Sequence, residues 1–402
     1  MEKRHAPVLR LKGFTDDWEQ RKLGSIVCDY SEKNPVDEDL PILTSSRQGI
    51  QKQEEHFGSE QRHDTIDYNV IPRGYCTYRN RSDDRTFTFN VNDCIERGIV
   101  SKFYPVFSID NGNAKFVTEY LNNNFEIKNK LAVLSVGTSQ VVLSLNNLKS
   151  LDIQIPSKDE QEKIGGYLNS FDNLITLHQR KLEKLQNIKK AMLEKMFPKN
   201  EEKTPKIRFS GFTSDWEQRK LSAVVKEVKR TDETSMAPVM MITAENGFIN
   251  QSERYSTNNA GQSLKKYILL EKGELAYNHG ASKLRPFGSC FALTTEEEAR
   301  IPFVYHCFFS DSENAEFLSI ELNGKAIEKQ LRRIVSSGAR MDGLLNISFG
   351  EYTSIPILLP RKDEQDKIAG YFSNIDHLIT LHQRKLEKLQ NIKKAMLEKM
   401  FV

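Results

Sequence analysis

Residues 174–197 read LITLHQRKLEKLQNIKKAMLEKMF, and residues 378–401 repeat all 24 letters at an offset of 204. A second repeat lies upstream, where GFTDDWEQRKL at 13–23 returns as GFTSDWEQRKL at 211–221. The stretches between these segments share no comparable run of letters. Repeats of this length within one chain indicate a tandem duplication with preserved ends. We interpret the two divergent middles as two different recognition surfaces on one scaffold.

The repeated 24 residues are predicted to be helical. At 3.6 residues per turn their apolar side chains gather on one face, and polar side chains lie opposite. A capping box formed by Ser157 and Glu160 places the start of the first helix near residue 158, and Pro198 ends it. Such a helix is about 60 Å long, and its single apolar face needs a partner.

The identical twin helix is the obvious partner, so we predict an intramolecular coiled coil between the two. The alternative is that each helix packs on its own globular domain. Identical outer faces also suggest that both helices meet the same kind of partner. The side chains expected to pack in the helix pair are Leu174, Leu182, Leu185, Ile188, Met192 and Met196 in the first copy and Leu378, Leu386, Leu389, Ile392, Met396 and Met400 in the second.

The divergent middles have the pattern of mixed α/β domains. Residues 85–91 alternate between polar and apolar side chains, and 131–136 and 150–155 also have the character of strands. A weak match between 70–79 and 269–278, at an offset of 199, indicates that both middles share one fold. We therefore predict globular domains at 1–157 and 207–361, helices at 158–198 and 362–402, and a linker at 199–206.

Composition limits the cellular setting. The chain has 402 residues, of which 38% are hydrophobic and 28% charged, and no apolar run approaches the roughly 18 residues that span a bilayer. The charged N-terminus has no signal-peptide pattern, so we expect a soluble cytoplasmic protein without membrane contact. Five cysteines without paired spacing predict neither a zinc site nor a disulfide framework.

The sequence contains no convincing catalytic motif. It lacks the GxxxxGK[ST] phosphate loop, the HExxH zinc motif and the Asn-Pro-Pro-aromatic run of adenine methyltransferases. The nearest nuclease pattern, Asp110 followed by Glu126 and Lys128, carries little information in a chain so rich in charge. We therefore predict no catalytic residue and no metal site, and expect the protein to act by binding.

Basic residues cluster in both divergent middles, although the net charge is only +3. DNA is read through Arg, Lys, Asn and Gln contacts to base edges, while small polar groups bind phosphates. The predicted DNA-binding residues of the first half are Arg73, Tyr75, Tyr78, Arg79, Arg81, Arg85, Thr138, Ser139 and Gln140. Those of the second half are Tyr277, Asn278, His279, Ser282, Lys283, Arg285, Ser336, Ser337 and Arg340.

Over its full length the chain resembles the specificity subunit of type I restriction–modification systems. The resemblance rests on the paired GFT-x-DWEQRKL segments, on a glycine-containing loop late in each middle, and on the DEQ-x-KI helix starts at 159–164 and 363–368. It implies an α/β (α+β) fold in which two target-recognition domains are separated by two long helices that the family conserves. The helices would form an antiparallel coiled coil, and the whole would be a pseudo-two-fold tandem repeat.

The resemblance also implies a function. Each domain would read one half of a split site in double-stranded DNA, and two modification subunits would dock on the helices and methylate adenine. Two restriction subunits would translocate and cleave DNA. The chain itself would be non-enzymatic and hold no cofactor, because S-adenosylmethionine, ATP and Mg²⁺ would bind to the partner subunits. Two other classes of protein are weighed against this one, a coiled-coil scaffold that binds only proteins and a self-sufficient DNA enzyme.

Overall fold

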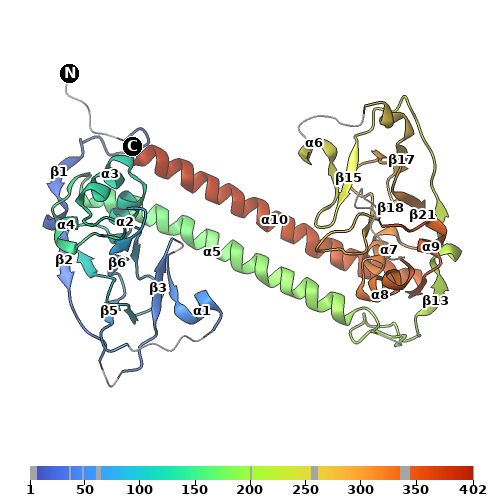
Figure 1. Cartoon of the computed structure of the whole chain (residues 1–402), viewed down its shortest axis with the longest axis horizontal. Coiled ribbons are helices and arrows are strands. Elements are labelled where there is room, and N and C mark those ends of the chain that lie inside the picture. Colours follow the sequence, from blue (N-terminus) through green and yellow to red (C-terminus); the bar gives the residue numbers. More distant parts are fainter. Residues whose placement is uncertain are drawn as a thin grey trace. The chain divides into compact units, whose positions relative to one another are not determined.

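The computed structural model describes residues 7–35, 38–47, 49–59, 65–199, 202–254, 261–335 and 345–401 (Figure 1). The chain divides into two compact units. Unit 1 consists of Met1–Lys181 and His382–Val402, and unit 2 is Leu182–Leu381. Each unit therefore contains one globular domain and parts of both long helices. We call the globular parts domain 1 (up to residue 157) and domain 2 (residues 202–361).

Domain 1 is built around a four-stranded sheet in the order β2-β10-β6-β8. Two-stranded pairs β1–β12, β3–β4, β5–β9 and β7–β11 surround it, and α2 and α3 lie beside it (Figure 1). The strands are β1 Glu19–Lys22, β2 Val27–Tyr30, β3 Leu43–Ser46, β4 Gly49–Lys52, β5 Asn69–Pro72, β6 Cys76–Tyr78, β7 Arg81–Ser82, β8 Phe89–Val91, β9 Arg97–Val100, β10 Val106–Ile109, β11 Val141–Val142 and β12 Asp152–Ile155. The helices are α1 Gln53–Phe57, α2 Ala114–Asn123, α3 Phe125–Leu134 and α4 Leu145–Lys149, with a 3₁₀ turn at Leu23–Ser25.

Domain 2 repeats this plan around the sheet β14-β21-β18-β19, with the pairs β13–β22, β15–β16 and β17–β20. Its strands are β13 Glu217–Lys220, β14 Lys226–Glu227, β15 Met240–Thr243, β16 Gly247–Asn250, β17 Ile268–Glu271, β18 Leu275–Asn278, β19 Ser289–Ala292, β20 Glu298–Ile301, β21 His306–Phe309 and β22 Pro356–Leu359. Its helices are α6 Gln251–Arg254, α7 Ala315–Leu322, α8 Lys325–Ile334 and α9 Phe349–Thr353, with 3₁₀ turns at Leu221–Ala223 and Gly261–Lys266. The mixed α/β fold predicted for both middles is confirmed.

One predicted strand is wrong. Residues 131–136 belong mainly to helix α3. The side chain of Asn124 caps the start of that helix, and the inward face of the helix places Ile127 and Leu131, one turn apart, in the core. An apolar run of this length does not distinguish a strand from a half-buried helix. Of the predicted strand at 85–91, only Phe89–Val91 forms, as β8. The strand at 150–155 is present as β12, Asp152–Ile155.

The long helices are α5, Lys158–Lys195, and α10, Lys362–Met400, and they run antiparallel within each unit. In unit 1, Lys393 lies 2.7 Å from Asp172, and the Nδ1 atoms of His178 and His382 are 2.8 Å apart. In unit 2, Lys189 lies 2.6 Å from Asp376. As the residue number rises along α5, the number of its partner on α10 falls. The helix pair predicted from the repeat and the antiparallel direction implied by the resemblance are therefore confirmed.

The side chains between the helices differ in part from the predicted set. Leu174, Leu378 and Ile392 are 44%, 41% and 38% exposed, so their assignment to the helix pair is corrected. Ile175 and Ile379, one position further along, are less exposed. Each lies three positions before the histidine that contacts the other helix, and residues three apart share one face of a helix. Leu182, Leu185, Ile188, Met192, Leu386, Leu389 and Met396 are half-buried as expected of packing residues, whereas Met196 and Met400 are buried in the domain cores.

Each domain core is completed by the end of the helix from the other half of the sequence. In unit 1, Leu397, Met400 and Phe401 join the core of domain 1, which also contains Ile164 and Leu168 from the start of α5. In unit 2, Met196 joins the core of domain 2, and Phe197 packs against it. Helix pairing and helix-to-domain packing therefore coexist, although the sequence presented them as alternatives.

The starts of the long helices are held by buried ion pairs. The carboxylate of Glu160 accepts two hydrogen bonds from Arg10, at 2.8 and 2.7 Å, and Glu364 accepts two from Arg208, at 2.6 and 2.7 Å. The reciprocal capping box predicted for Ser157 is therefore not formed, because Glu160 turns its carboxylate to Arg10 instead. No helix among the described residues is both long and apolar enough to cross a membrane.

A buried carboxyl group in domain 2 leads to a pH prediction. Glu321 is 8% exposed and forms no ion pair with any described residue, and burial raises its pKa to about 7. The folded state therefore holds the Glu321 proton more tightly than the unfolded state, whose glutamate titrates near 4.3. The stabilisation by this group is complete below that unfolded value and is lost as the pH rises through 7.

We expect Glu321→Gln to stabilise unit 2 by about 3–4 kcal/mol at pH 8 relative to its effect at pH 4, since one pKa unit corresponds to roughly 1.4 kcal/mol. Chemical denaturation at both pH values, followed through Trp216 fluorescence, measures this. Glu316→Gln, an exposed position on the same helix, is the control and should show no such difference. Equal effects of Glu321→Gln at both pH values would contradict the prediction.

Candidate nucleic-acid interface

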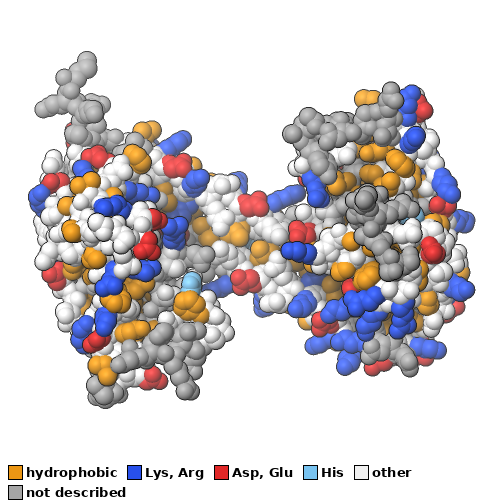
Figure 2. Space-filling view, in the orientation of Figure 1, with side chains coloured by type: hydrophobic (Ala, Val, Ile, Leu, Met, Phe, Trp, Pro, Cys, Tyr) orange, Lys and Arg blue, Asp and Glu red, His pale blue; other side chains and the backbone are white. Residues whose placement is uncertain are grey.

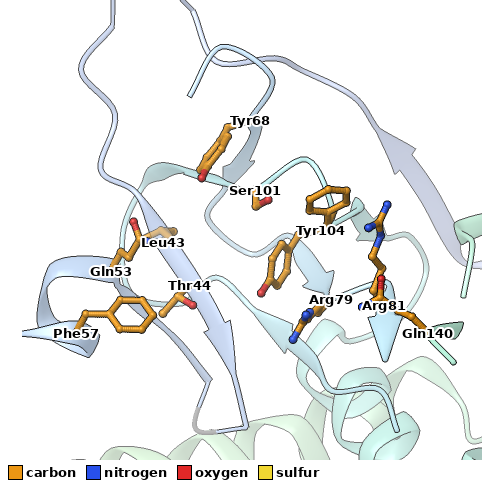
Figure 3. A pocket seen from close by; sticks show the side chains of 11 residues that line it. Leu43, Thr44, Gln53, Phe57, Tyr68, Arg79, Arg81, Ser101, Tyr104 and Gln140 are labelled. Atoms are coloured by element: carbon orange, nitrogen blue, oxygen red, sulfur yellow. The ribbon is translucent and has the colours of Figure 1, made fainter. Parts of the chain in front are cut away.

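Domain 1 contains a cleft of about 330 Å³ between the β3–β4 hairpin with α1 and the segments that follow β6 and β9 (Figure 3). Its walls combine two arginines, several neutral polar groups and a few apolar side chains. The lining residues are Leu43, Thr44, Gln53, Phe57, Tyr68, Arg79, Arg81, Ser101, Phe103, Tyr104 and Gln140. Three of them, Arg79, Arg81 and Gln140, belong to the predicted DNA-binding set.

Local structure explains why these three side chains meet. Strand β6 ends at Tyr78, whose hydroxyl donates to the Leu143 carbonyl at 2.9 Å. The next residue but one, Asn80, donates its N–H to the Phe103 carbonyl and accepts from the Leu143 N–H. The flanking Arg79 and Arg81 are therefore left on the exposed side. Pairing of Arg81 with Val142 in the β7–β11 ladder then brings the neighbouring loop, which ends in Gln140, to the same cleft.

The cleft is electropositive. None of its lining residues is a carboxylate, and Arg79 makes no hydrogen bond or ion pair with a described residue. The guanidinium of Arg81 lies over the Phe103 ring, 4.1 Å from its centroid, which orients the planar group without consuming its N–H donors. Burial raises the pKa of Tyr104, and the nearby positive charge of Arg79 opposes that rise. Unpaired guanidinium N–H groups in a cleft without lining carboxylates can donate hydrogen bonds to acceptors on nucleic acid.

Gln140 is held differently. Its side-chain amide donates to the Asp83 carboxylate at 3.3 Å, so its carbonyl oxygen remains an acceptor. The loop residues before it, Thr138 and Ser139, are exposed and make no hydrogen bond to a described side chain. All three are therefore accessible from outside the domain, as contact with DNA requires.

Four other predicted residues of domain 1 have structural partners. Arg73 pairs with Glu96 and donates to the Asp93 carbonyl, and Tyr75 packs edge-on against Tyr30, so both lie outside the cleft. The guanidinium of Arg85 donates to the carbonyls of Ala132, Ser135 and Gly137, and thereby holds the start of the loop that carries Gln140. Tyr78 is fully buried, and its assignment to DNA contact is corrected.

In domain 2 the structure also separates exposed candidates from core residues. Tyr277 and His279 are buried, and both His279 ring nitrogens lie 2.7 Å from backbone carbonyls, so these two are core residues and not DNA contacts. Arg285 is desolvated, which lowers its pKa, and it donates to the Asn323 carbonyl at the end of α7. Ser282 caps the turn before Arg285, and Lys283 is exposed. Ser336, Ser337 and Arg340 lie outside the described residues.

Helix α8 of domain 2 presents a basic face, and Figure 2 shows lysine and arginine side chains gathered over this part of unit 2. Ile327 and Leu331 of α8 are buried, which turns the opposite face outward. The exposed cations are Lys325, Lys329, Arg332 and Arg333. They belong to the basic residues that cluster in the second divergent middle of the sequence.

Sequence reasoning missed most of the cleft. Tyr68 precedes β5, Phe103 and Tyr104 lie in the loop after β9, and Thr44, Gln53 and Phe57 come from the hairpin and the short helix after it. No motif or periodicity links these positions, because only the fold brings them together. Among the described residues, no three His, Cys, Asp or Glu side chains are grouped to hold a metal ion.

Comparison with known proteins assigns the fold to a family. The family model of the type I restriction modification DNA specificity domain matches residues 15–187, which include the whole cleft. Over this part the chain is similar to type I specificity subunits. The resemblance drawn from the sequence is thereby confirmed.

Two curated specificity subunits of Methanocaldococcus jannaschii are similar to this chain. The putative MjaX specificity subunit is 24% identical over 298 residues, which cover 69% of this chain and 65% of that protein. The MjaVIII specificity subunit is 26% identical over 272 residues, or 62% of this chain and 61% of that protein. The chain thus spans somewhat less than two thirds of the length of these relatives.

A solved structure shows the same fold. The crystal structure of a type I restriction–modification S subunit from M. genitalium superposes with a TM-score of 0.62, covers 99% of both chains and is 14% identical in sequence. This likeness concerns the fold alone. It agrees with the duplicated α/β domains and the long helices of this chain.

Proposed function

We propose that this specificity subunit reads a bipartite site in double-stranded DNA, with one half-site for each domain. The observation that carries the proposal is the cleft of domain 1, which exposes Arg79 and Arg81 without any lining carboxylate. Arginine donors in an electropositive setting recognise phosphates and base edges. The basic face of α8 gives domain 2 its own surface for the phosphate backbone.

The chain is proposed to be non-catalytic and to hold no cofactor. Modification subunits would carry S-adenosylmethionine and dock on the outer faces of α5 and α10, which are identical over 24 residues. Restriction subunits would carry ATP and Mg²⁺. Two copies of each are proposed, because the repeated helix sequence offers the same surface twice. Much of the phosphate contact would then come from these partners, which is compatible with a net charge of only +3.

Mapping methylated adenines in the native host, with and without this chain, tests the proposal. We expect one bipartite motif to lose methylation when the chain is deleted and to regain it on complementation. An unchanged methylation map, together with no modification subunit in a pull-down of the chain, would favour the scaffold that binds only proteins.

The long helices lead to a prediction about the spacing of the half-sites. Inserting four residues within Leu182–Lys195 and four within Leu386–Lys399 lengthens each helix by about 6 Å and roughly preserves its apolar face. If the helices set the separation, the unspecified spacer should grow by one or two base pairs, at about 3.4 Å per base pair. Both half-sites should stay the same.

Methylome mapping of the insertion variant measures the spacer. Activity is expected to fall, because each added base pair also rotates the half-sites by about one-tenth of a turn. Four residues inserted in the linker at 202–206 are the control, since they leave both helices unchanged, and should leave the spacer as it was. A normal spacer with full activity in the helix variant would show that the helices act only as a docking platform.

A further inference from the structure

We propose that Arg79 selects a guanine in the half-site read by domain 1. The inference rests on the proposed function and adds to it the identity of one base and the residue that reads it. Arg79 follows the last residue of β6, lines the cleft, and is exposed (Figure 3). It has no ion-pair partner among the described residues, so its donors need not leave a protein acceptor to reach DNA.

The surroundings of Arg79 orient it without neutralising it. Tyr104 shares the cleft, and the Phe103 ring beside it carries the guanidinium of Arg81 at 4.1 Å. The two guanidinium groups belong to alternate residues of one segment, and the hydrogen bonds of Asn80 fix that segment from both sides. Arg81 forms no ion pair with a described residue, and the nearby Asp83 carboxylate accepts from the Gln140 amide, so a second unpaired cation lies close to the point where Arg79 would meet an acceptor.

The donor geometry favours guanine over the other bases. A guanidinium presents two parallel N–H groups, and guanine offers two acceptors, O6 and N7, side by side in the major groove. Adenine places an amino donor beside N7, which would leave one arginine N–H without an acceptor. The rest of the cleft wall is neutral and includes Gln140, Thr44 and the apolar Phe57. Such a mixed wall complements the polar and apolar groups of a base edge, whereas a phosphate site would be built from cations.

Domain 2 does not repeat this arrangement. The carbonyls of Asn80 and His279 each accept a 2.9 Å hydrogen bond, from the N–H groups of Leu143 and Leu345, so these residues hold equivalent positions. The residue equivalent to Arg79 is therefore Asn278. Its amide donates to the Ile242 carbonyl at 3.0 Å and accepts from the Gly280 N–H at 2.9 Å, so both ends of the side chain are occupied. Guanine selection by this position is thus a property of domain 1.

The experiment compares the wild-type chain with Arg79→Gln in the native host, where the full complex assembles, and maps methylated adenines for both. We expect the wild-type motif to contain a guanine in one half-site that Arg79→Gln relaxes or changes, while the other half-site and the spacer persist. With the purified complex, affinity for the specific duplex should fall about 5- to 150-fold, the equivalent of 1–3 kcal/mol for one bidentate contact. Affinity for random duplex should change far less.

The matched control is Arg73→Gln, which removes one arginine from the same domain outside the cleft. It should leave every letter of the motif unchanged. Arg79→Lys keeps the charge but not the paired donors, so it should also relax the guanine position, and thermal unfolding of each variant checks the fold.

The outcomes are distinct. Relaxation of one guanine position by Arg79→Gln, but not by Arg73→Gln, supports the proposal. An unchanged motif, or equal losses on specific and random duplexes, overturns it, because Arg79 would then contact phosphate or no DNA. Relaxation at a position that was not guanine also overturns it. If the wild-type chain directs no methylation at all, the proposed function itself fails, and the two failures are told apart by the wild-type map alone.

Discussion

Replacing residues 1–157 with the corresponding domain of another specificity subunit is expected to change one half-site of the DNA motif completely. The other half-site and the spacer should stay the same. The reason is that the described cleft, with Arg79, Arg81 and Gln140, lies entirely within domain 1, while domain 2 has its own sheet, core and basic helix. Methylome mapping of the chimera gives both half-sites in one measurement.

The structure adds a condition to this replacement. The core of domain 1 contains Leu397, Met400 and Phe401 from the end of α10, and Arg10 pairs with Glu160 at the start of α5. The donor domain must therefore contain an apolar surface on which the end of α10 can pack and an arginine that can form the ion pair with Glu160. A donor without them would fail because it cannot fold on these helices, and not because recognition is shared.

The reciprocal replacement of residues 207–361 is the control. It should change only the half-site that the first chimera preserved. A chimera that folds, binds modification subunits and nevertheless alters both half-sites would contradict the assignment of one half-site to each domain.

The second large effect concerns the last turn of α10. Phe401 is 2% exposed, and its ring centroid lies 5.6 Å from that of Phe116 and 5.7 Å from that of Tyr120. Truncating a buried phenylalanine removes its transfer free energy and leaves a cavity, which typically costs about 3–5 kcal/mol. We expect Phe401→Ala to lower the free energy of unfolding of unit 1 by that amount.

The two tryptophans of the chain allow each unit to be followed separately. Trp18 lies in the core of domain 1, 5.8 Å from Phe116, and Trp216 lies in the core of domain 2. In a Trp216→Phe background, chemical denaturation followed by fluorescence therefore reports unit 1. Phe401→Ala should shift this transition to lower denaturant concentration.

Two variants serve as controls for Phe401→Ala. Ile392→Ala on the same helix removes a side chain that is 38% exposed, so it should change stability by less than about 1 kcal/mol. Phe197→Ala, at the equivalent position of the first repeat, packs against Trp216 and Phe317 and should instead affect unit 2. A Trp18 transition that does not move in Phe401→Ala would show that the end of α10 is not part of the core of domain 1.

The sequence was most informative where the physical signal is periodic or repeated. The spacing of apolar residues identifies an amphipathic helix, and the 24 identical letters indicate that two such helices share one structure. The signal was weaker for short segments. Residues 131–136 were predicted as a strand because six apolar and small residues fit either structure, and only the N-cap at Asn124 and the buried face of α3 decide for a helix.

The candidate site was predictable only in its residue types. Arg79, Arg81 and Gln140 were chosen because arginine and amide side chains read DNA, and the structure places them in one cleft. The same reasoning selected Arg73 and Arg85, whose partners Glu96 and Gly137 lie 23 and 52 residues away in the sequence. An arginine with a distant acceptor is indistinguishable from a free one until the chain is folded.

The sequence by itself determined the duplication, the two α/β domains, the helix pair and the resemblance to type I specificity subunits, because repeats, periodicity and motifs are properties of the linear chain. Only the tertiary structure decided which side chains are free and what completes each core. Tyr78 and Tyr277 are as polar in the sequence as any surface tyrosine, yet long-range packing buries both. Likewise, nothing in the letters of 397–401 shows that they complete the core of domain 1. That contact joins residues almost 300 positions apart, and the burial of apolar surface there, rather than any local preference, fixes it.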